Sequence, residues 1–353
     1  MSKLKIGVIF GGTSTEHDVS IASGTSVIKN LDKETYEVLP IYIGKDNKWY
    51  LYNEKVENIK NLKVGEQLQN LEQIENIFDF LRKIDVAFPV LHGLYGEDGT
   101  IQGLFEMLQI PYVGTKVLAS SISMDKVYTK ALFEKAQIKQ TPYVYIRKYN
   151  DQYIYINEAF EETRYNIEET CQTIENKLQY PVFVKPSNSG SSVGVKKAKN
   201  LEELKEAILF AEQYDRKIII EEGVIGKEIE CSVLGNEDVI ASCTGEIIPA
   251  DEFYSYDAKY YNEESICKIP SVLPEKVEEE VRKTAIKVFK LVDGSGLSRV
   301  DFFVTENEEV YINEINTMPG FTEISMYSKL WEASGVSYKE LLKRLIALAT
   351  EQK

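Results

Sequence analysis

Two segments far apart in the chain carry the residue types best suited to phosphate and metal chemistry. In the first, a strand ending at Lys185-Pro186 runs into a Gly/Ser-rich loop over residues 187–194. Small residues let backbone N–H groups approach phosphate oxygens, and a lysine just before them adds a positive charge. The P-loop pattern and the pattern G-x-G-x-x-G are both absent. The loop is therefore either a different kind of nucleotide site or a plain surface loop.

The second segment is an expected β-hairpin with oxygen-rich side chains. Glu314 and Asn316 are two residues apart, so they lie on one face of a strand. Asp301 lies on the partner strand, and we expect it to face Glu314 if Val304 pairs with Tyr311. Carboxylate and amide oxygens suit Mg²⁺, whereas zinc is disfavoured because neither histidine is near. The hairpin predicts a magnesium site, with a solvated acidic strand end as the alternative.

The bulk properties narrow the class of protein. The 353 residues suggest two or three domains. The net charge of −15 argues against a nucleic-acid partner. No apolar run approaches the roughly 18 to 20 residues that span a bilayer, and no signal-peptide cleavage region follows the first residues. We therefore expect a cytoplasmic protein with no membrane partner, whose four cysteines, lacking C-x-x-C spacing, are structural thiols.

The first third of the chain alternates between strand and helix patterns. Apolar runs predict strands over 4–10, 37–43 and 86–91, with helices over 19–31 and 72–83 between them. This alternation is typical of an open parallel α/β domain, which we assign to residues 1–120. Ligands of such sheets bind beyond the carboxyl ends of the strands. Here those ends are residues 11–16 and 92–98.

The rest of the chain predicts two further domains, over residues 121–215 and 216–353. Residues 147–180 are polar and are interpreted as a surface excursion with one helix, and 251–265 as an irregular loop of the kind that forms lids. The remaining expected helices and strands are listed in chain order: helix 124–136, strand 143–146, helix 168–178, strand 181–185, helix 201–213, strands 217–222 and 228–234, helix 274–291, the hairpin, and a last helix from 338.

Several single residues gain meaning only in combination. Lys126 alone would be an exposed helix lysine, and Arg299 alone a structural ion-pair partner. His92 and Glu16 follow strand ends, yet either could be a structural group with all its hydrogen bonds made within the protein.

These residues together with the two segments form a combination that is specific to one family. The chain resembles the D-alanine–D-alanine ligase family of ATP-grasp enzymes from Lys5 almost to its end. The resembling motifs are Gly11-Gly12-Thr13-Ser14-Thr15-Glu16-His17-Asp18-Val19-Ser20, Leu91-His92-Gly93, Gly96-Glu97-Asp98-Gly99-Thr100-Ile101-Gln102-Gly103, Ser123-Met124-Asp125-Lys126 and Asp257-Ala258-Lys259-Tyr260.

The resemblance implies an ATP-grasp fold and a reaction. Members of this family join two D-alanines through an acyl phosphate and release ADP and phosphate. The dipeptide that they make is used in peptidoglycan precursor synthesis. The implied cofactors are ATP and two Mg²⁺ ions, with Mn²⁺ as a possible substitute, and the implied assembly is a homodimer.

The resemblance also implies a role for individual residues. The ATP site would contain Lys126, Lys185, Ser192, Glu221, Glu222, Val224 and Glu228, and the metal ligands would be Asp301, Glu314 and Asn316. The D-alanine sites would contain Val19 and His92 for the first substrate and Ser325 and Met326 for the second. The catalytic residues would be a triad of Glu16, Ser191 and Tyr260, the oxyanion partners Arg299 and Gly320, and Lys259 at the transferring phosphate.

Two alternatives stay open. A D-alanine–D-serine ligase would share the fold, but the apolar Met326 suits a methyl group better than a serine hydroxyl. A nucleotide-binding regulator without catalysis would be expected to have lost at least one residue of the phosphate and metal set. All of that set is present: Lys126, Lys185, Arg299, Asp301, Glu314 and Asn316.

Overall fold

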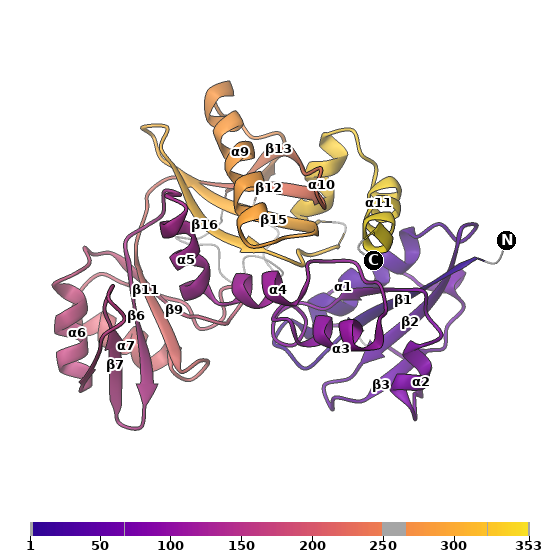
Figure 1. Ribbon diagram of the computed structural model, residues 1–353, viewed down its shortest axis with the longest axis horizontal. Coiled ribbons are helices and arrows are strands. Elements are labelled where there is room, and N and C mark those ends of the chain that lie inside the picture. Colours follow the sequence, from indigo (N-terminus) through magenta and orange to yellow (C-terminus); the bar gives the residue numbers. More distant parts are fainter. Residues whose placement is uncertain (1–2, 67, 249–265, 323, 352–353) are drawn as a thin grey trace.

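The first sheet is built on β1 (Leu4–Gly11), whose side chains at Ile6, Val8, Ile9 and Phe10 are fully buried. Burial on both faces is typical of a central parallel strand covered by helices. The computed structural model describes residues 3–66, 68–248, 266–322 and 324–351. Within them, strands form three sheets, which Figure 1 shows as three neighbouring bodies.

The strands of the first sheet run in the order β4-β3-β2-β1-β5. β1, β2 (Tyr36–Ile43) and β5 (Val86–Val90) are parallel, as the sequence predicts, while β3 (Trp49–Tyr52) and β4 (Leu71–Gln73) add an antiparallel edge. The helices of this region are α1 (His17–Asn30), the short η1 (Val56–Asn58), α2 (Ile77–Leu81) and α3 (Thr100–Leu108).

The predicted helix over 72–83 is wrong in its first half. Residues 71–73 form β4, and α2 begins only after Asn76, whose side chain accepts a hydrogen bond from the Asp79 N–H. An N-cap of this kind starts a helix because it satisfies a backbone N–H that has no partner within the helix.

The second sheet is antiparallel and has the order β10-β9-β11-β6-β7-β8. It contains β6 (Tyr143–Tyr149), β7 (Gln152–Ile156), β8 (Glu162–Tyr165), β9 (Val182–Pro186), β10 (Lys196–Ala198) and β11 (Lys217–Glu222), with α6 (Ile167–Glu175) and α7 (Leu201–Ala211) packed against it. The interpretation of 147–180 as a surface excursion is therefore wrong in part, because β7 and β8 extend this sheet. Tyr153, Ile154 and Ile156 are buried although their neighbours are polar.

The third sheet has the order β14-β13-β12-β15-β16. Its strands are β12 (Lys227–Gly235), β13 (Ile240–Ile248), β14 (Ile266–Lys268), β15 (Gly296–Val304) and β16 (Val310–Asn316), and α9 (Glu275–Leu291) covers one face with a shared apolar core. The sequence patterns did not predict β13 and β14. The predicted loop 251–265 lies outside the described residues.

The hairpin of β15 and β16 has a different register from the predicted one. Val304 pairs with Val310 instead of Tyr311, yet Asp301 still pairs with Glu314 because the register shifts by one residue between Phe302 and Asp301. The extra residue is Asn313, which makes a β-bulge. Such bulges re-aim side chains and are common beside functional sites.

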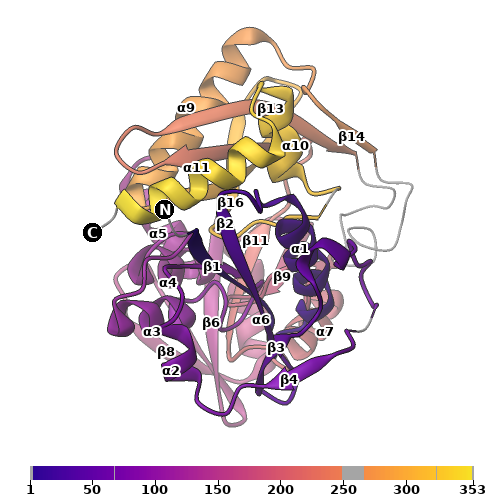
Figure 2. The same cartoon turned by 90° about the vertical axis from the view of Figure 1, so that its right-hand side faces the viewer.

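Helices α4 (Val117–Met124) and α5 (Lys126–Lys135) connect the first sheet to the other two, and two helices at the C-terminal end, α10 (Met326–Ala333) and α11 (Tyr338–Glu351), return to it. One apolar core joins β1 and β5 to Phe321, Tyr327 and Leu341. In Figure 2, α11 lies beside the first sheet, so the C-terminal helix packs against the N-terminal part of the chain.

We keep the three-domain division as a proposal. By hydrogen bonding, β11 belongs to the second sheet, so a division by sheets separates β11 from β12 after Glu222.

None of the four cysteines, all in the described part, forms a disulfide. No helix among the described residues has the length and apolar character needed to cross a membrane.

Candidate active site

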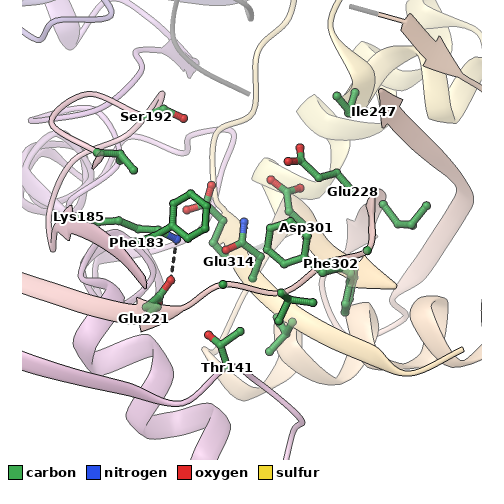
Figure 3. A pocket seen from close by; sticks show the side chains of 18 of the residues that line it. Thr141, Phe183, Lys185, Ser192, Glu221, Glu228, Ile247, Asp301, Phe302 and Glu314 are labelled. Atoms are coloured by element: carbon green, nitrogen blue, oxygen red, sulfur yellow. Dashed lines mark hydrogen bonds and ion pairs between the residues drawn. The ribbon is translucent and has the colours of Figure 1, made fainter. Parts of the chain in front are cut away.

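A cavity of about 510 Å³ lies between the second and third sheets. Most of the predicted nucleotide and metal residues line it, and so does Ser191 of the predicted triad: Lys126, Lys185, Ser191, Ser192, Glu221, Glu222, Val224, Glu228, Asp301 and Glu314. In Figure 3, Lys185 and Phe183 come from one side, and Glu228 and Asp301 from the other. The structure thus brings together segments that are up to about a hundred and ninety residues apart, as counted from Lys126 to Glu314.

Lys185 lies at the centre of a buried charge cluster. Its Nζ donates to Oε2 of Glu221 at 2.6 Å, and Nζ of Lys130 lies 3.2 Å from the other oxygen, Oε1. Burial would raise the pKa of Glu221, but the two ammonium groups outweigh it and lower that pKa to about 2. Glu221 is therefore ionised, and it raises the pKa of Lys185 against the opposing effect of burial.

A partly buried arginine, Arg299, holds Asp301 of the hairpin. Nε and Nη2 of Arg299 donate to Oδ1 and Oδ2 of Asp301 at 2.8 and 2.7 Å, and Nε also lies 3.0 Å from Glu230. Asn316 donates from Nδ2 to Asp301 at 2.9 Å. Burial would lower the pKa of Arg299, but the two carboxylates outweigh it and raise that pKa further.

These oxygens fit a hard metal ion by their chemistry. Asp301 and Glu314 are paired across the bulge, line the cavity and keep part of their side chains exposed, at 13% and 28%. Lys126 Nζ lies 3.5 Å from Glu314, so each of the two carboxylates has a cationic group beside it. No cluster of three or more His, Cys, Asp and Glu suited to a metal occurs in the described ranges. A set of two carboxylates and one amide is nevertheless what Mg²⁺ accepts together with waters and phosphate oxygens.

The Gly/Ser-rich loop over residues 187–194, called the glycine loop below, is anchored to the start of α5. Asp125 caps α5 by accepting from the Val127 N–H at 3.1 Å, and it also accepts from Ser187 Oγ at 2.7 Å. Lys126, the next residue, donates to the Ser189 carbonyl at 2.7 Å. One helix end therefore positions both a cavity lysine and the loop above it.

Glu16 connects the first sheet to the glycine loop. It is 6% exposed, and Ser191 Oγ donates to its Oε1. A Cβ at Gly93 would lie 2.6 Å from the Glu16 carboxylate, and one at Gly190 would lie 2.8 Å from it, so glycine at both positions allows this approach. Ser191 has a φ of 48°, a conformation that is strained for a residue with a side chain. Two of the three predicted triad members are thus in contact, while Tyr260 lies outside the described residues.

His92 is buried and fully bonded. Its Nδ1 lies 3.0 Å from the Met318 carbonyl and its Nε2 3.0 Å from Ser23 Oγ. Burial lowers the pKa of His92, with Glu16 opposing. Five residues on, Glu97 accepts from the Gly93 N–H at 2.8 Å, and burial together with Glu16 raises its pKa to about 8.

The predicted residues for the second substrate lie at the start of α10. Ser325 Oγ accepts from the Thr322 N–H at 2.9 Å, and a Cβ at Gly320 would lie 2.8 Å from that Oγ. Met326 is buried with Ile247. Val19 is 1% exposed within α1 and does not line the cavity. Lys259, like Tyr260, lies outside the described residues.

The sequence patterns did not identify three residues that hold the site together. They are Asp125, Lys130 and Glu230. Weak signals for two of them exist, because Lys130 follows Lys126 by one helical turn and Glu230 follows Glu228 on the same strand face. Neither spacing identifies a partner, which only the packing of α5 and β12 against other elements supplies.

Solved structures share this fold over almost the whole chain. The D-alanine-D-alanine ligase from Coxiella burnetii has a TM-score of 0.82 at 33% identity, covering 100% of this chain and 95% of that one. The VanG D-Ala:D-Ser ligase from Enterococcus faecalis has a TM-score of 0.84 at 34% identity, covering 99% and 100%. Fold and site together define an ATP-grasp enzyme.

Sequence comparisons identify the family within that class. The models for the D-ala D-ala ligase N-terminus and C-terminus match residues 5–115 and 132–347. The D-alanine--D-alanine ligase of Acetivibrio thermocellus is 48% identical over 375 residues, covering 99% of this chain and 96% of the relative. That of Clostridium novyi is 49% identical over 354 residues, covering 99% of each. The chain belongs to the D-alanine–D-alanine ligase family.

Proposed function

We propose that this protein joins two molecules of D-alanine into D-alanyl-D-alanine, with cleavage of ATP to ADP and phosphate. The observation that carries the proposal is the meeting of Glu16, the glycine loop and the acidic hairpin, which combines an amino-acid-binding carboxylate with a phosphate and metal site. The product is a building block for peptidoglycan synthesis.

ATP occupies the cavity between the second and third sheets. Its adenine ring packs among Phe183, Ile247 and Phe302, beside Glu221, Glu222 and Val224, and its ribose hydroxyls bind Glu228. Lys126, Lys185 and Ser192 contact the phosphates. The support for this arrangement is that all of these residues line one cavity.

The reaction needs two group transfers. A carboxylate oxygen of the first D-alanine attacks the γ-phosphorus, which breaks the bond to ADP and forms an acyl phosphate. The amine of the second D-alanine then attacks the acyl carbon, phosphate leaves and a proton is lost from nitrogen. Phosphoryl transfer depends mainly on alignment and charge neutralisation.

Protein groups have separate tasks in these steps. Glu16, held by Ser191 and Tyr260, binds the ammonium of the first D-alanine, next to His92 and Val19. Arg299 and the Gly320 N–H stabilise the oxyanion of the tetrahedral intermediate, and Lys259 binds the transferring phosphate. Ser325 and Met326 bind the second D-alanine. Closure over the site protects the acyl phosphate from water.

Members of this family use ATP and depend on a divalent metal. For this chain we propose two Mg²⁺ ions, replaceable by Mn²⁺, held by Asp301, Glu314 and Asn316. When bound, they neutralise phosphate charge and align the γ-phosphoryl group.

We further propose that the protein acts in the cytoplasm, where ATP is available, as a homodimer. A light-scattering mass measurement checks the homodimer.

A second candidate function is ligation of D-alanine to D-serine. The observation that favours it is the TM-score of 0.84 to the Enterococcus faecalis D-Ala:D-Ser ligase. Met326 argues against it, because it is 6% exposed and packs with Ile247 and Leu330 in an apolar cluster. Such an apolar surface suits the methyl group of D-alanine better than a hydroxyl.

The test is product analysis with purified protein. The protein is incubated with ATP, Mg²⁺ and D-alanine, with L-alanine alone and with D-alanine plus D-serine as parallel reactions, and products are identified by mass. We expect D-alanyl-D-alanine with one phosphate per dipeptide and little mixed product. Mainly mixed dipeptide would favour the second candidate, and no ATP turnover with any amino acid would contradict both.

A further inference from the structure

Lys130 is a buried lysine to which the reaction above assigns no task. Its side chain is 3% exposed, and it does not belong to the lining of the cavity that contains Lys185. Burying an ammonium group costs several kcal/mol unless a partner compensates it. A lysine in this place therefore needs an explanation in terms of its partners.

The carboxylate of Glu221 has one lysine on each oxygen. Lys185 donates to Oε2 at 2.6 Å from the cavity side, and Lys130 lies 3.2 Å from Oε1. The two lysines differ in exposure, at 17% for Lys185 and 3% for Lys130. Only Lys185 is in a position to exchange Glu221 for a ligand.

Other contacts hold Lys130 in place. Its Nζ lies 3.2 Å from Thr141 Oγ1 and 3.4 Å from Gln140 Oε1, and 5.3 Å from the centre of the Tyr143 ring. The Gln140 amide also donates back to the Lys130 carbonyl at 2.9 Å. These contacts give Lys130 a fixed geometry that a phosphate in the cavity does not disturb.

We propose that Lys130 is a positioning residue that serves as the permanent counter-charge of Glu221 and so leaves Lys185 available to bind nucleotide phosphates. The inference rests on the proposed ATP site and extends it to a residue behind the cavity wall. With Lys130 present, Lys185 can turn to a phosphate without leaving a buried carboxylate unpaired. Without Lys130, Lys185 would be the one cation left on Glu221 among the described residues, and phosphate binding would have to break that pair. The low pKa of Glu221 fits this task, since the carboxylate stays charged throughout.

The experiment compares adenosine with ADP as probes in the full-length protein. Adenosine tests the base and sugar contacts alone, and ADP with Mg²⁺ adds the phosphates. In Lys130→Met we expect ADP affinity to fall roughly tenfold, which equals about 1.4 kcal/mol, while adenosine affinity changes less than about twofold. Lys130→Arg should restore most of the ADP affinity. Lys135→Met, an exposed position of the same helix, is the matched control.

A double-mutant cycle tests whether Lys130 acts through Glu221. In Glu221→Gln the carboxylate charge is gone, so adding Lys130→Met should change the ratio of ADP to adenosine affinity by less than about twofold. This pair also serves if Lys130→Met alone fails to fold, because the double variant leaves no unpaired carboxylate. An equal loss for both probes, or no loss for ADP, or an undiminished effect in the Glu221→Gln background, would overturn the inference. Absence of ADP binding in the unmodified protein would instead contradict the proposed nucleotide site.

Discussion

At the residue scale, Glu314 has the most exposed carboxylate among the proposed metal ligands and is easily tested. We expect Glu314→Gln to keep the fold, because its ion pair with Lys126 is partly exposed and worth little. Loss of one charged ligand should remove several kcal/mol of charge stabilisation, so kcat should fall about a hundredfold or more. ADP release at saturating Mg²⁺ and circular dichroism are the measurements. Glu306→Gln, exposed in the turn of the same hairpin, is the control. Unchanged turnover would exclude Glu314 as a ligand.

Glu97 shows how one buried carboxyl affects stability with pH. Burial and Glu16 raise its pKa from 4.5 to about 8. The folded state therefore binds a proton that the unfolded state releases, and stability is lost as the pH rises from 4.5 to about 8. We expect Glu97→Gln, which keeps an acceptor for the Gly93 N–H, to flatten this dependence. Urea unfolding across the window measures it, with the exposed Glu134→Gln as control. Parallel curves for the Glu97 variant and the unmodified protein would contradict the prediction.

At the scale of elements, the start of α5 is the joint that holds the glycine loop. Asp125 caps the helix, accepts from Ser187 and pairs with Lys217. We expect Asp125→Ala to lower the free energy of unfolding by at least the roughly 0.5–2 kcal/mol of a lost cap. It should also raise KM for ATP, because Lys126 and the loop lose their common anchor.

Two variants separate these effects. Asp125→Asn keeps an acceptor oxygen for the helix N–H group and should recover part of the stability. Asn200→Ala removes the cap of α7, which accepts from the Glu203 N–H at 3.0 Å, and should lower the melting temperature without changing KM. If Asp125→Ala and Asn200→Ala had the same KM for ATP, the positioning role of the α5 cap would be wrong.

At the scale of the whole molecule, α11 joins the two ends of the chain. Leu341 is fully buried in the core that contains β1 and β5. We expect Leu341→Ala to cost about 2–5 kcal/mol and to lower the melting temperature of the first sheet as well as of the C-terminal part. Thermal unfolding followed by Trp49 and Trp331 fluorescence, each with the other tryptophan replaced by Phe, tests this. Lys343→Ala, exposed on the same helix, is the control. A transition that shifts for Trp331 alone would contradict the shared core.

Much of the fold could be predicted from local patterns. Continuous apolar runs identified β1, β2 and β5. Residue type and spacing were also enough to select Lys185 with its loop, and Asp301 with Glu314, as candidate site residues. Lys185, part of its loop, Asp301 and Glu314 line the cavity. The predictions for residues 72–76 and 147–165 failed because the strands there are short and have polar neighbours, so their periodicity is weak.

The sequence by itself determined the family and the parallel core of the first sheet, and it supplied the residues proposed here for phosphate and metal binding, because these depend on residue types and short spacings. Only the tertiary structure decided how those residues meet. The bulge at Asn313 keeps Asp301 opposite Glu314 in a register that alternation did not predict. The pairing of Lys130 with Glu221, and of Glu16 with Ser191, joins residues 91 and 175 positions apart. Such contacts depend on how whole elements pack, and no local pattern encodes them.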